Sequence, residues 1–154
     1  MNRSERAYEL FRSGYNCCQA VVLAFSDYIA AKGGPDEKSL AAMCSGFGGG
    51  MGRMREVCGT VSGMTMLAGF IIPAGDVNDR ASKTANYELV RHFAERFRER
   101  NGSIVCRELL GLTPVQNESA APSPRTSEYY EKRPCGELCS VAASIVEEYL
   151  KEEI

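Results

Sequence analysis

The chain has 154 residues, which suits one domain with a substantial hydrophobic core. Hydrophobic residues make up 44% of it and charged residues 25%, ordinary values for a globular protein that exclude disorder of the whole chain. The net charge of −2 excludes the strongly basic surface with which many proteins bind nucleic acid.

The N-terminal part of the chain shows the apolar spacing of helices and almost no strand pattern. Gly14 is a good helix stop, and Asn16 is a natural N-cap with Gln19 as its capping-box partner. Asp36 can cap a further short helix. The pattern therefore predicts three helices, over residues 3–13, 17–32 and 37–45.

The middle of the chain places a glycine-rich loop, residues 46–52, between helices. A buried helix is predicted after it, over about 55–70. The longest helix is predicted over about 77–100, because its apolar side chains form one stripe and its charged side chains cover the opposite face. Asn101 and Gly102 end this helix.

The last part of the chain combines a short helix, a connection and a final helix. Ser103 can cap a helix over 104–110, and the proline- and serine-rich residues 111–127 are expected to be extended or flexible. Pro134 then opens a final helix with close helical periodicity. The sequence thus predicts an all-α fold, a single-domain helical bundle of about five to six helices over residues 1–154.

The uncharged stretch 57–75 approaches the length of a membrane span, but its glycines, its proline Pro73 and its polar side chains lower its apolar density. A buried helix of a bundle is therefore favoured over a membrane span. Gly59 and Gly63 have the spacing of closely packed helices, which makes a homo-oligomer through this face conceivable. No apolar leader follows the charged N-terminus, so a cytoplasmic location is expected.

Cysteine is the unusual part of the composition, with seven cysteines beside a single histidine. An odd number excludes a fully paired disulfide framework. Four of the seven coincide with predicted helix starts, where backbone N–H groups and the helix dipole lower the pKa of a thiol. These four are Cys17, Cys58, Cys106 and Cys135.

The other three cysteines have no such place in the predicted helices. Cys18 and Cys44 are expected to pack in the core as small apolar side chains. Cys139 follows Cys135 by one helical turn on the same face, a spacing that suits either a metal clip or a resolving pair.

The segments around these cysteines read Gly-Tyr-Asn-Cys-Cys-Gln-Ala-Val, Cys-Gly-Thr-Val-Ser-Gly and Cys-Arg-Glu-Leu-Leu-Gly, with Phe-Gly-Gly-Gly-Met-Gly-Arg between the first two. In this order, and followed by Cys135, they resemble the C_GCAxxG_C_C family, which is named for its cysteine pattern. The resemblance implies a small helical protein with redox chemistry, often encoded near transporters. It assigns the four characteristic positions to Cys17, Cys58, Cys106 and Cys135. Thr60 stands where the family more often has alanine, and its hydroxyl is placed to bond the Cys58 sulfur.

The glycine-rich loop has two interpretations of equal weight. Gly48, Gly49, Gly50 and Arg53 form a candidate anion cradle, because backbone N–H groups in such a loop can hold a phosphate, carboxylate or oxyanion. Alternatively, the glycines mark a place where two elements approach too closely for side chains. Either way, the loop leads the chain to Cys58.

Two further side chains are weaker candidates for chemistry. Glu56 stands two residues before Cys58 and is a candidate proton acceptor, although a solvated surface position is favoured. His92 lies on the long charged helix, where a half-exposed surface residue is favoured over a ligand or base.

Three functions are weighed. In the first, the four helix-start cysteines converge in one site of a thiol redox protein, a possible thiol–disulfide oxidoreductase with an unknown redox partner and no required cofactor. In the second, the same thiolates, with Cys139 available as a further ligand, bind Zn²⁺ or an iron–sulfur cluster. In the third, the chain is a non-catalytic partner of a membrane transporter, and its cysteines mostly pack in the core.

Overall fold

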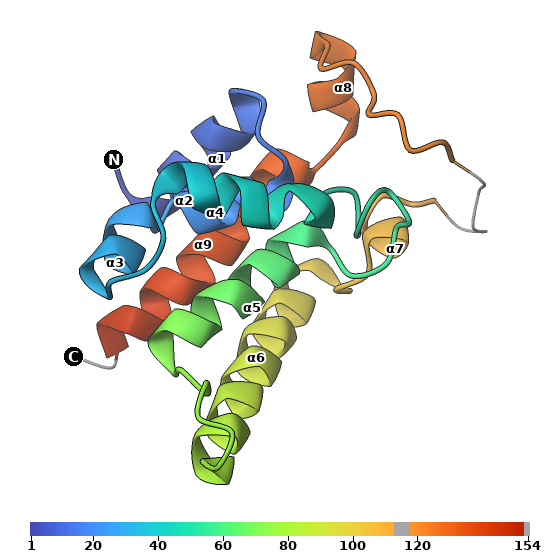
Figure 1. Ribbon diagram of the computed structural model, residues 1–154. Coiled ribbons are helices and arrows are strands. Elements are labelled where there is room, and N and C mark those ends of the chain that lie inside the picture. The colour runs from blue at the N-terminus through green and yellow to red at the C-terminus, as the bar shows by residue number, and fades with distance from the viewer. Residues whose placement is uncertain (113–117, 153–154) are drawn as a thin grey trace.

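The computed structural model describes residues 1–112 and 118–152, and over these residues the protein is all-α, as predicted. They form nine α-helices and one short 3-10 helix. In chain order these are α1 (Arg3–Arg12), α2 (Cys17–Leu23), α3 (Ser26–Ala31), α4 (Glu37–Cys44), η1 (Ser45–Phe47), α5 (Gly59–Ile71), α6 (Arg80–Asn101), α7 (Cys106–Leu109), α8 (Ser127–Lys132) and α9 (Cys135–Glu152) (Figure 1).

The predicted number of helices is too low for two reasons. The predicted helix 17–32 is divided into α2 and α3, because Phe25 has φ −113° and ψ 20° and its side chain is fully buried. Helix α8 was not predicted, although Thr126 caps it and the charges of Glu128 and Lys132 pair one turn apart. Part of the predicted extended connection 111–127, residues 113–117, lies outside the described residues.

Several helix ends lie where the sequence predicts them. Asn16 and Gln19 form a complete capping box at the start of α2, and Asp36 caps α4. Gly102 ends α6 with a φ of 88°, a left-handed conformation that glycine adopts without strain. The prediction for Ser103 is wrong, because α7 begins two residues later than a Ser103 cap requires and its N-cap is Val105. The Ser103 hydroxyl instead accepts a hydrogen bond from the Val105 N–H at 3.0 Å.

The core lies between α1, α2, α5 and α9, with α6 packed along α5 and α9. Helix α5 approaches α2 closely through its glycines: a Cβ on Gly63 would lie 3.0 Å from the Val21 Cβ. Gly59 packs in the same way against the start of α2. The glycine face of α5 is therefore used within the chain, and it does not offer a surface for the conceivable homo-oligomer.

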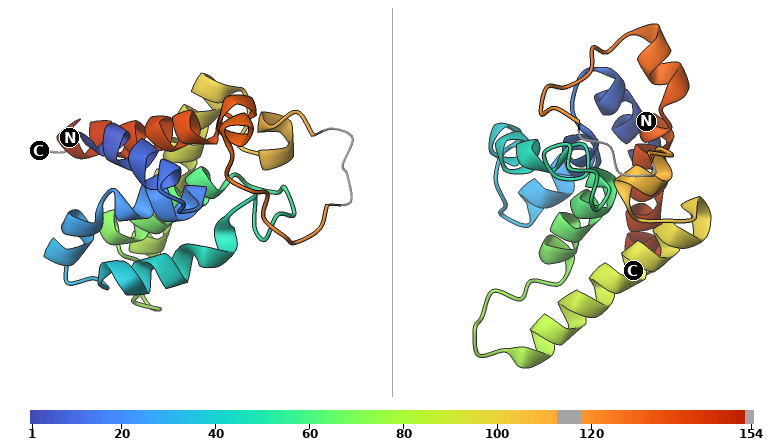
Figure 2. Two further views of the ribbon diagram at one scale, coloured as in Figure 1. Left: turned by 90° about the horizontal axis from the view of Figure 1, so that it is seen from above. Right: turned by 90° about the vertical axis from the view of Figure 1, so that its right-hand side faces the viewer.

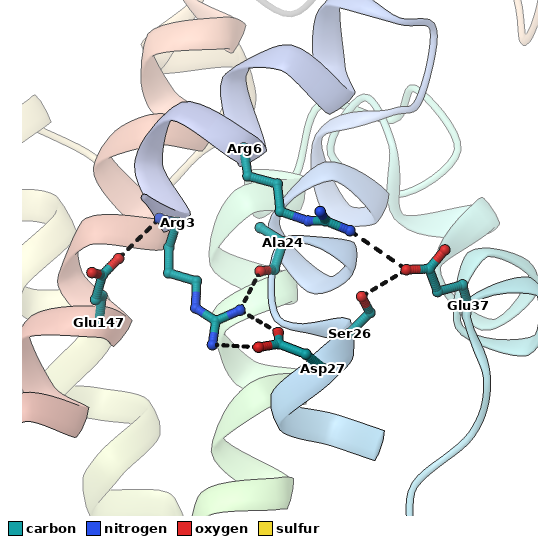
Figure 3. Close-up of polar contacts among 7 residues, drawn as sticks. All are labelled: Arg3, Arg6, Ala24, Ser26, Asp27, Glu37 and Glu147. Carbon is teal, nitrogen blue, oxygen red and sulfur yellow. Dashed lines mark hydrogen bonds and ion pairs between the residues drawn. The ribbon is translucent and has the colours of Figure 1, made fainter. Parts of the chain in front are cut away.

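A polar network ties the N-terminal helix to its neighbours (Figure 3). Arg3 ion-pairs with Asp27 and donates to the Ala24 carbonyl at 2.8 Å, while its backbone N–H donates to Glu147 on α9 at 3.1 Å. Beside it, Arg6 lies 3.5 Å from Glu37. These contacts fix α1 against α3, α4 and α9 at the end of the bundle away from the cysteine motifs.

The starts of α5, α7 and α9 lie toward one end of the molecule, together with the loop that precedes α5 (Figure 1). At the opposite end, the turn from α5 into α6 projects away from the other helices (Figure 2). Within residues 1–112 and 118–152, no helix has both the length and the apolar character needed to cross a membrane.

Candidate functional site

The structure places the four predicted cysteines at four helix starts. Cys17, Cys106 and Cys135 are the first residues of α2, α7 and α9. Cys58 is the N-cap of α5, because that helix begins at Gly59 rather than near Arg55. All four side chains line a single cavity of about 290 Å³. Four segments far apart in the sequence thus bring their thiols to one place.

A short antiparallel pairing, which the sequence analysis missed, brings two of these thiols together. Val57 and Val105 form an isolated β-bridge. The Cys58 N–H donates to the Ile104 carbonyl at 2.8 Å, and the Cys106 N–H donates to the Glu56 carbonyl at 2.6 Å. The bridge aligns the residues directly before α5 and α7, so that both helices begin side by side with a cysteine at the start.

The glycine-rich loop has an unusual backbone. Five consecutive residues, 49–53, have φ between 58° and 70°, and Arg55 has φ 62°. Non-glycine residues avoid this region, at a cost of about 1–3 kcal/mol each where the surroundings enforce it, and such strain clusters at functional sites. Two non-glycine side chains within 49–53, Met51 and Arg53, carry this conformation.

The loop contacts the cysteines directly. A Cβ on Gly50 would lie 2.7 Å from the Cys106 Cβ, and one on Gly48 would lie 2.8 Å from the Asn16 Cβ. These distances fit the second interpretation of the loop, close approach of two elements. Backbone hydrogen bonding from Gly49 also reaches the Cys17 sulfur.

The arginines of the loop are occupied by a carboxylate of the chain. Glu118 accepts from Arg55 Nε at 2.6 Å and Nη2 at 3.0 Å, and from Arg53 Nη2 at 3.2 Å. The pKa of Glu118 is lowered to about 2. Hydrogen bonding from Arg55 is the largest cause, and the charge of Arg55 and the contact with Arg53 add to it. Arg53 thus binds an anion, as the predicted cradle requires, but that anion is Glu118. Binding of an external anion by Gly48, Gly49, Gly50 and Arg53 stays a prediction.

Arg55 links this ion pair to the cysteines. The residue is only 6% exposed, and its Nη1 lies 3.7 Å from the Cys106 sulfur. Hydrogen bonding to Glu118 raises the pKa of Arg55 further, so the guanidinium is permanently charged. A buried positive charge beside a sulfur stabilises negative charge that develops there.

Burial, rather than the helix dipole, dominates the acidity of the site thiols. Desolvation raises the pKa of Cys17, although backbone hydrogen bonding from Gly49 and Cys18 lowers it. Desolvation also raises the pKa of Cys58, and it raises the pKa of Cys135 to about 12. The expectation that helix starts give these thiols a low pKa is wrong for these three, because the loss of water outweighs the N–H groups.

Thr60 stabilises the Cys58 sulfur as its position in the sequence predicts. The Thr60 hydroxyl lies 3.1 Å from the Cys58 sulfur, and both side chains are buried. This hydrogen bond lowers the pKa of Cys58, against the larger effect of burial.

The three remaining cysteines lie in the core and do not line the cavity. Cys18 hydrogen-bonds to Cys44, which raises the pKa of Cys18 and lowers that of Cys44. The Cys139 thiol is directed at the Cys17 carbonyl oxygen at 3.8 Å. All seven cysteines are free thiols in the structure.

Two weaker candidates lie away from the cavity. Glu56 is exposed and ion-pairs with Arg107 at 3.1 Å, so it is a surface carboxylate rather than a base for Cys58. His92 is exposed on α6, with its ring against Phe93 and Tyr149.

The connection before α8 supplies site residues that the sequence analysis missed. Glu118 and Arg125 are the only charged residues of segment 111–127. Two isolated charges in an uncharged connection could have indicated that they make specific contacts. Arg125 lines the cavity and donates to the carbonyls of Phe11 and Tyr15 at 2.9 and 3.0 Å. Arg133 also lines the cavity, two residues before Cys135, with its guanidinium 4.9 Å from the centre of the Tyr129 ring.

The binding of a metal by Cys17, Cys58, Cys106 and Cys135 stays a prediction. Over the part of the chain that the structure describes, no three side chains of Cys, His, Asp or Glu are grouped as metal ligands. Cys139, the further ligand considered from the sequence, lies behind Cys17 in the core rather than on the cavity.

A comparison with protein families finds one match. The family model described as "Putative redox-active protein (C_GCAxxG_C_C)" matches residues 15–149, nearly the whole chain and all four cysteines of the cavity. No curated protein and no solved structure matches the chain.

Proposed function

Because the chain belongs to the C_GCAxxG_C_C family, we propose that it is a thiol redox protein that exchanges a dithiol for a disulfide. The observation that carries the proposal is the meeting of four thiols from distant segments on one cavity. Three more cysteines are present, yet none of them lines it. Free thiols throughout the structure suit a reducing compartment such as the cytoplasm.

Cys17 is the thiol best placed to begin the exchange. Cys17 and Cys135 are partly exposed, whereas Cys58 and Cys106 are buried at 5% and 7% exposure. Of the two exposed thiols, Cys135 has a pKa that burial raises to about 12. Cys17 interacts electrostatically with each of the other three cavity cysteines: Cys58, Cys106 and Cys135. Cys17 therefore lies close to all three. Backbone hydrogen bonding from Gly49 and Cys18 stabilises the thiolate once it forms.

The reaction is written with an external disulfide as the oxidant. The Cys17 thiolate attacks one sulfur of that disulfide, forming a mixed disulfide and releasing the other half as a thiolate, which takes up a proton. A second thiolate, from Cys58, Cys106 or Cys135, then attacks the Cys17 sulfur and releases the remaining half. Two protein thiols are oxidised, and one external disulfide is reduced to two thiols.

The test measures metal content, absorption spectrum and free thiols on one anaerobically purified sample. The proposal expects no stoichiometric metal, no visible charge-transfer band, and a thiol count that falls by two or four after treatment with hydroxyethyl disulfide. A stoichiometric metal or cluster that is lost when the four cysteines are replaced would establish the alternative function. An unchanged thiol count would instead favour the non-catalytic partner of a transporter.

A further inference from the structure

The wall of the cysteine cavity is positively charged, although the whole chain is acidic. Four arginines line it, and no aspartate or glutamate is among the described residues that do. The net charge of the chain is −2, so this concentration of positive charge is local. The four are Arg53, Arg55, Arg125 and Arg133.

Three of these arginines are already engaged by groups of the chain. Arg53 and Arg55 hold Glu118. Arg125 donates to two backbone carbonyls near the end of α1, and its guanidinium lies 4.3 Å from the centre of the Phe11 ring. These contacts hold the connection 118–126 against the loop and α1, where it forms one wall of the cavity.

Arg133 differs from the other three. Its guanidinium lies 4.9 Å from the centre of the Tyr129 ring, and among the described residues no carboxylate pairs with it. A cation–π contact with a ring leaves the N–H groups of a guanidinium free to bind a carboxylate in a bidentate way. An anion bound here would lie beside Cys135, which begins α9 two residues later.

The rest of the cavity is largely apolar and small. Its lining includes Leu109, Leu110, Leu138 and Pro122, which suit a short aliphatic chain. A volume of about 290 Å³ accommodates a small molecule and is too small for a folded protein segment.

We propose that the cavity binds a low-molecular-weight disulfide that carries carboxylate groups, with one carboxylate held by Arg133 and the sulfurs facing Cys17 and Cys135. This inference rests on the proposed thiol exchange and adds the charge and size of its substrate. The exchange is the one written above, in which the disulfide is reduced to two thiols and two cysteines are oxidised.

The experiment compares three small disulfides of different charge: dithiodipropionate (anionic), hydroxyethyl disulfide (neutral) and cystamine (cationic). The rate of mixed-disulfide formation is measured by quenching and mass spectrometry for the wild type and for Arg133→Gln. The variant is expected to react about tenfold more slowly with dithiodipropionate, a loss of one charge-assisted contact of about 1.4 kcal/mol. Its rate with hydroxyethyl disulfide is expected to change less than about twofold, and Arg133→Lys is expected to restore part of the loss.

The matched control is Arg12→Gln. Arg12 stacks on Tyr130 at 4.1 Å, on the same helix as Tyr129, but it does not line the cavity. This variant is expected to leave all three rates unchanged. Equal slowing of all three disulfides by Arg133→Gln, or no slowing of any, would overturn the inference.

A sulfur-free ligand separates failure of this inference from failure of the proposed function. Suberate has the chain length of dithiodipropionate but no disulfide, so its binding does not depend on thiol chemistry. If no disulfide reacts with the site, the thiol function fails. Calorimetry then decides the anion site: binding of suberate to the wild type and not to Arg133→Gln supports it, and equal or absent binding contradicts it.

Discussion

The acidity of Cys17 depends on two opposing influences on its sulfur. Burial removes water and raises the pKa, while the backbone of Gly49 and the start of α2 lower it. Burial is the stronger influence, so the thiol is protonated at neutral pH. Reaction therefore needs the thiolate to form transiently, and the glycine-rich loop provides the hydrogen bonding that makes this less costly.

Replacing Cys17 tests its role directly. Cys17→Ser is expected to lower the rate of reaction of the folded protein with hydroxyethyl disulfide by at least about 100-fold, because Cys58 and Cys106 are buried and burial raises the pKa of Cys135 to about 12. The measurement is the rate of mixed-disulfide formation, with the fold checked by circular dichroism. Cys18→Ala is the control: Cys18 is adjacent in sequence but fully buried, and its replacement should leave the rate within about twofold.

At the scale of the elements, the approach of α5 to α2 determines where Cys17 lies. Gly59 leaves no room for a side chain: a Cβ there would contact the Cys17 sulfur and lie 2.8 Å from the Phe47 carbonyl oxygen. The same helix contains Gly69, where a Cβ would meet nothing within 4 Å. Substitution of Gly59 therefore tests the close packing of α5 against α2, and substitution of Gly69 tests helix propensity alone.

Gly59→Ala is expected to lower the free energy of unfolding by about 1–3 kcal/mol and to slow the reaction of Cys17, because the new methyl group displaces its sulfur. Gly69→Ala is expected to raise the free energy of unfolding by up to about 1 kcal/mol, since alanine favours a helix. Chemical denaturation and the mixed-disulfide assay measure both effects. Similar stabilities for the two variants would show that α2 and α5 are not packed as described.

Glu118, together with Arg125, holds the connection 118–126 to the site. Its pKa of about 2 is below the ordinary value of 4.5, so its ion pairs stabilise the fold above about pH 4.5 and are lost as the pH falls toward 2. Glu118→Gln should therefore cost about 1–2 kcal/mol at pH 7, after allowing for screening by water, and progressively less between pH 4.5 and 2. Denaturation across this pH range measures the difference.

Glu128→Gln is the control for this prediction. Glu128 pairs with Lys132 on the exposed face of α8, and its removal should change stability by less than about 0.5 kcal/mol at any pH. A pH-independent difference between Glu118→Gln and the wild type would contradict the role of the ion pairs.

The starts of α2 and α4 were predictable because they depend on local signals. Asn16, Gln19 and Asp36 cap helices through neighbours three residues away, and the position of Cys17 follows from the cap before it. The bridge between Val57 and Val105 was not predictable, because a single pairing leaves no alternating pattern in the sequence. The same holds for contacts made only by tertiary packing, such as those of Glu118 and Arg55.

At the scale of the whole molecule, the buried thiols make stability depend on alkaline pH. A raised pKa in the folded state means that folding holds the proton more tightly, so this stability is present below the ordinary value of 9.0 and is lost above it. The free energy of unfolding is expected to fall from about pH 9 toward 12 in reductant. Cys135→Ser should show a smaller fall, and an identical fall would contradict the burial of the Cys135 thiol.

The central claim, that four distant thiols act together, is tested most directly by mapping the disulfide that forms. The reduced protein is treated anaerobically with one equivalent of hydroxyethyl disulfide, quenched with acid, alkylated and digested for mass spectrometry. We predict one intramolecular disulfide that joins Cys17 to Cys58, Cys106 or Cys135, with Cys18, Cys44 and Cys139 alkylated as free thiols. A disulfide confined to these last three cysteines, or no disulfide in the folded protein, would contradict the account.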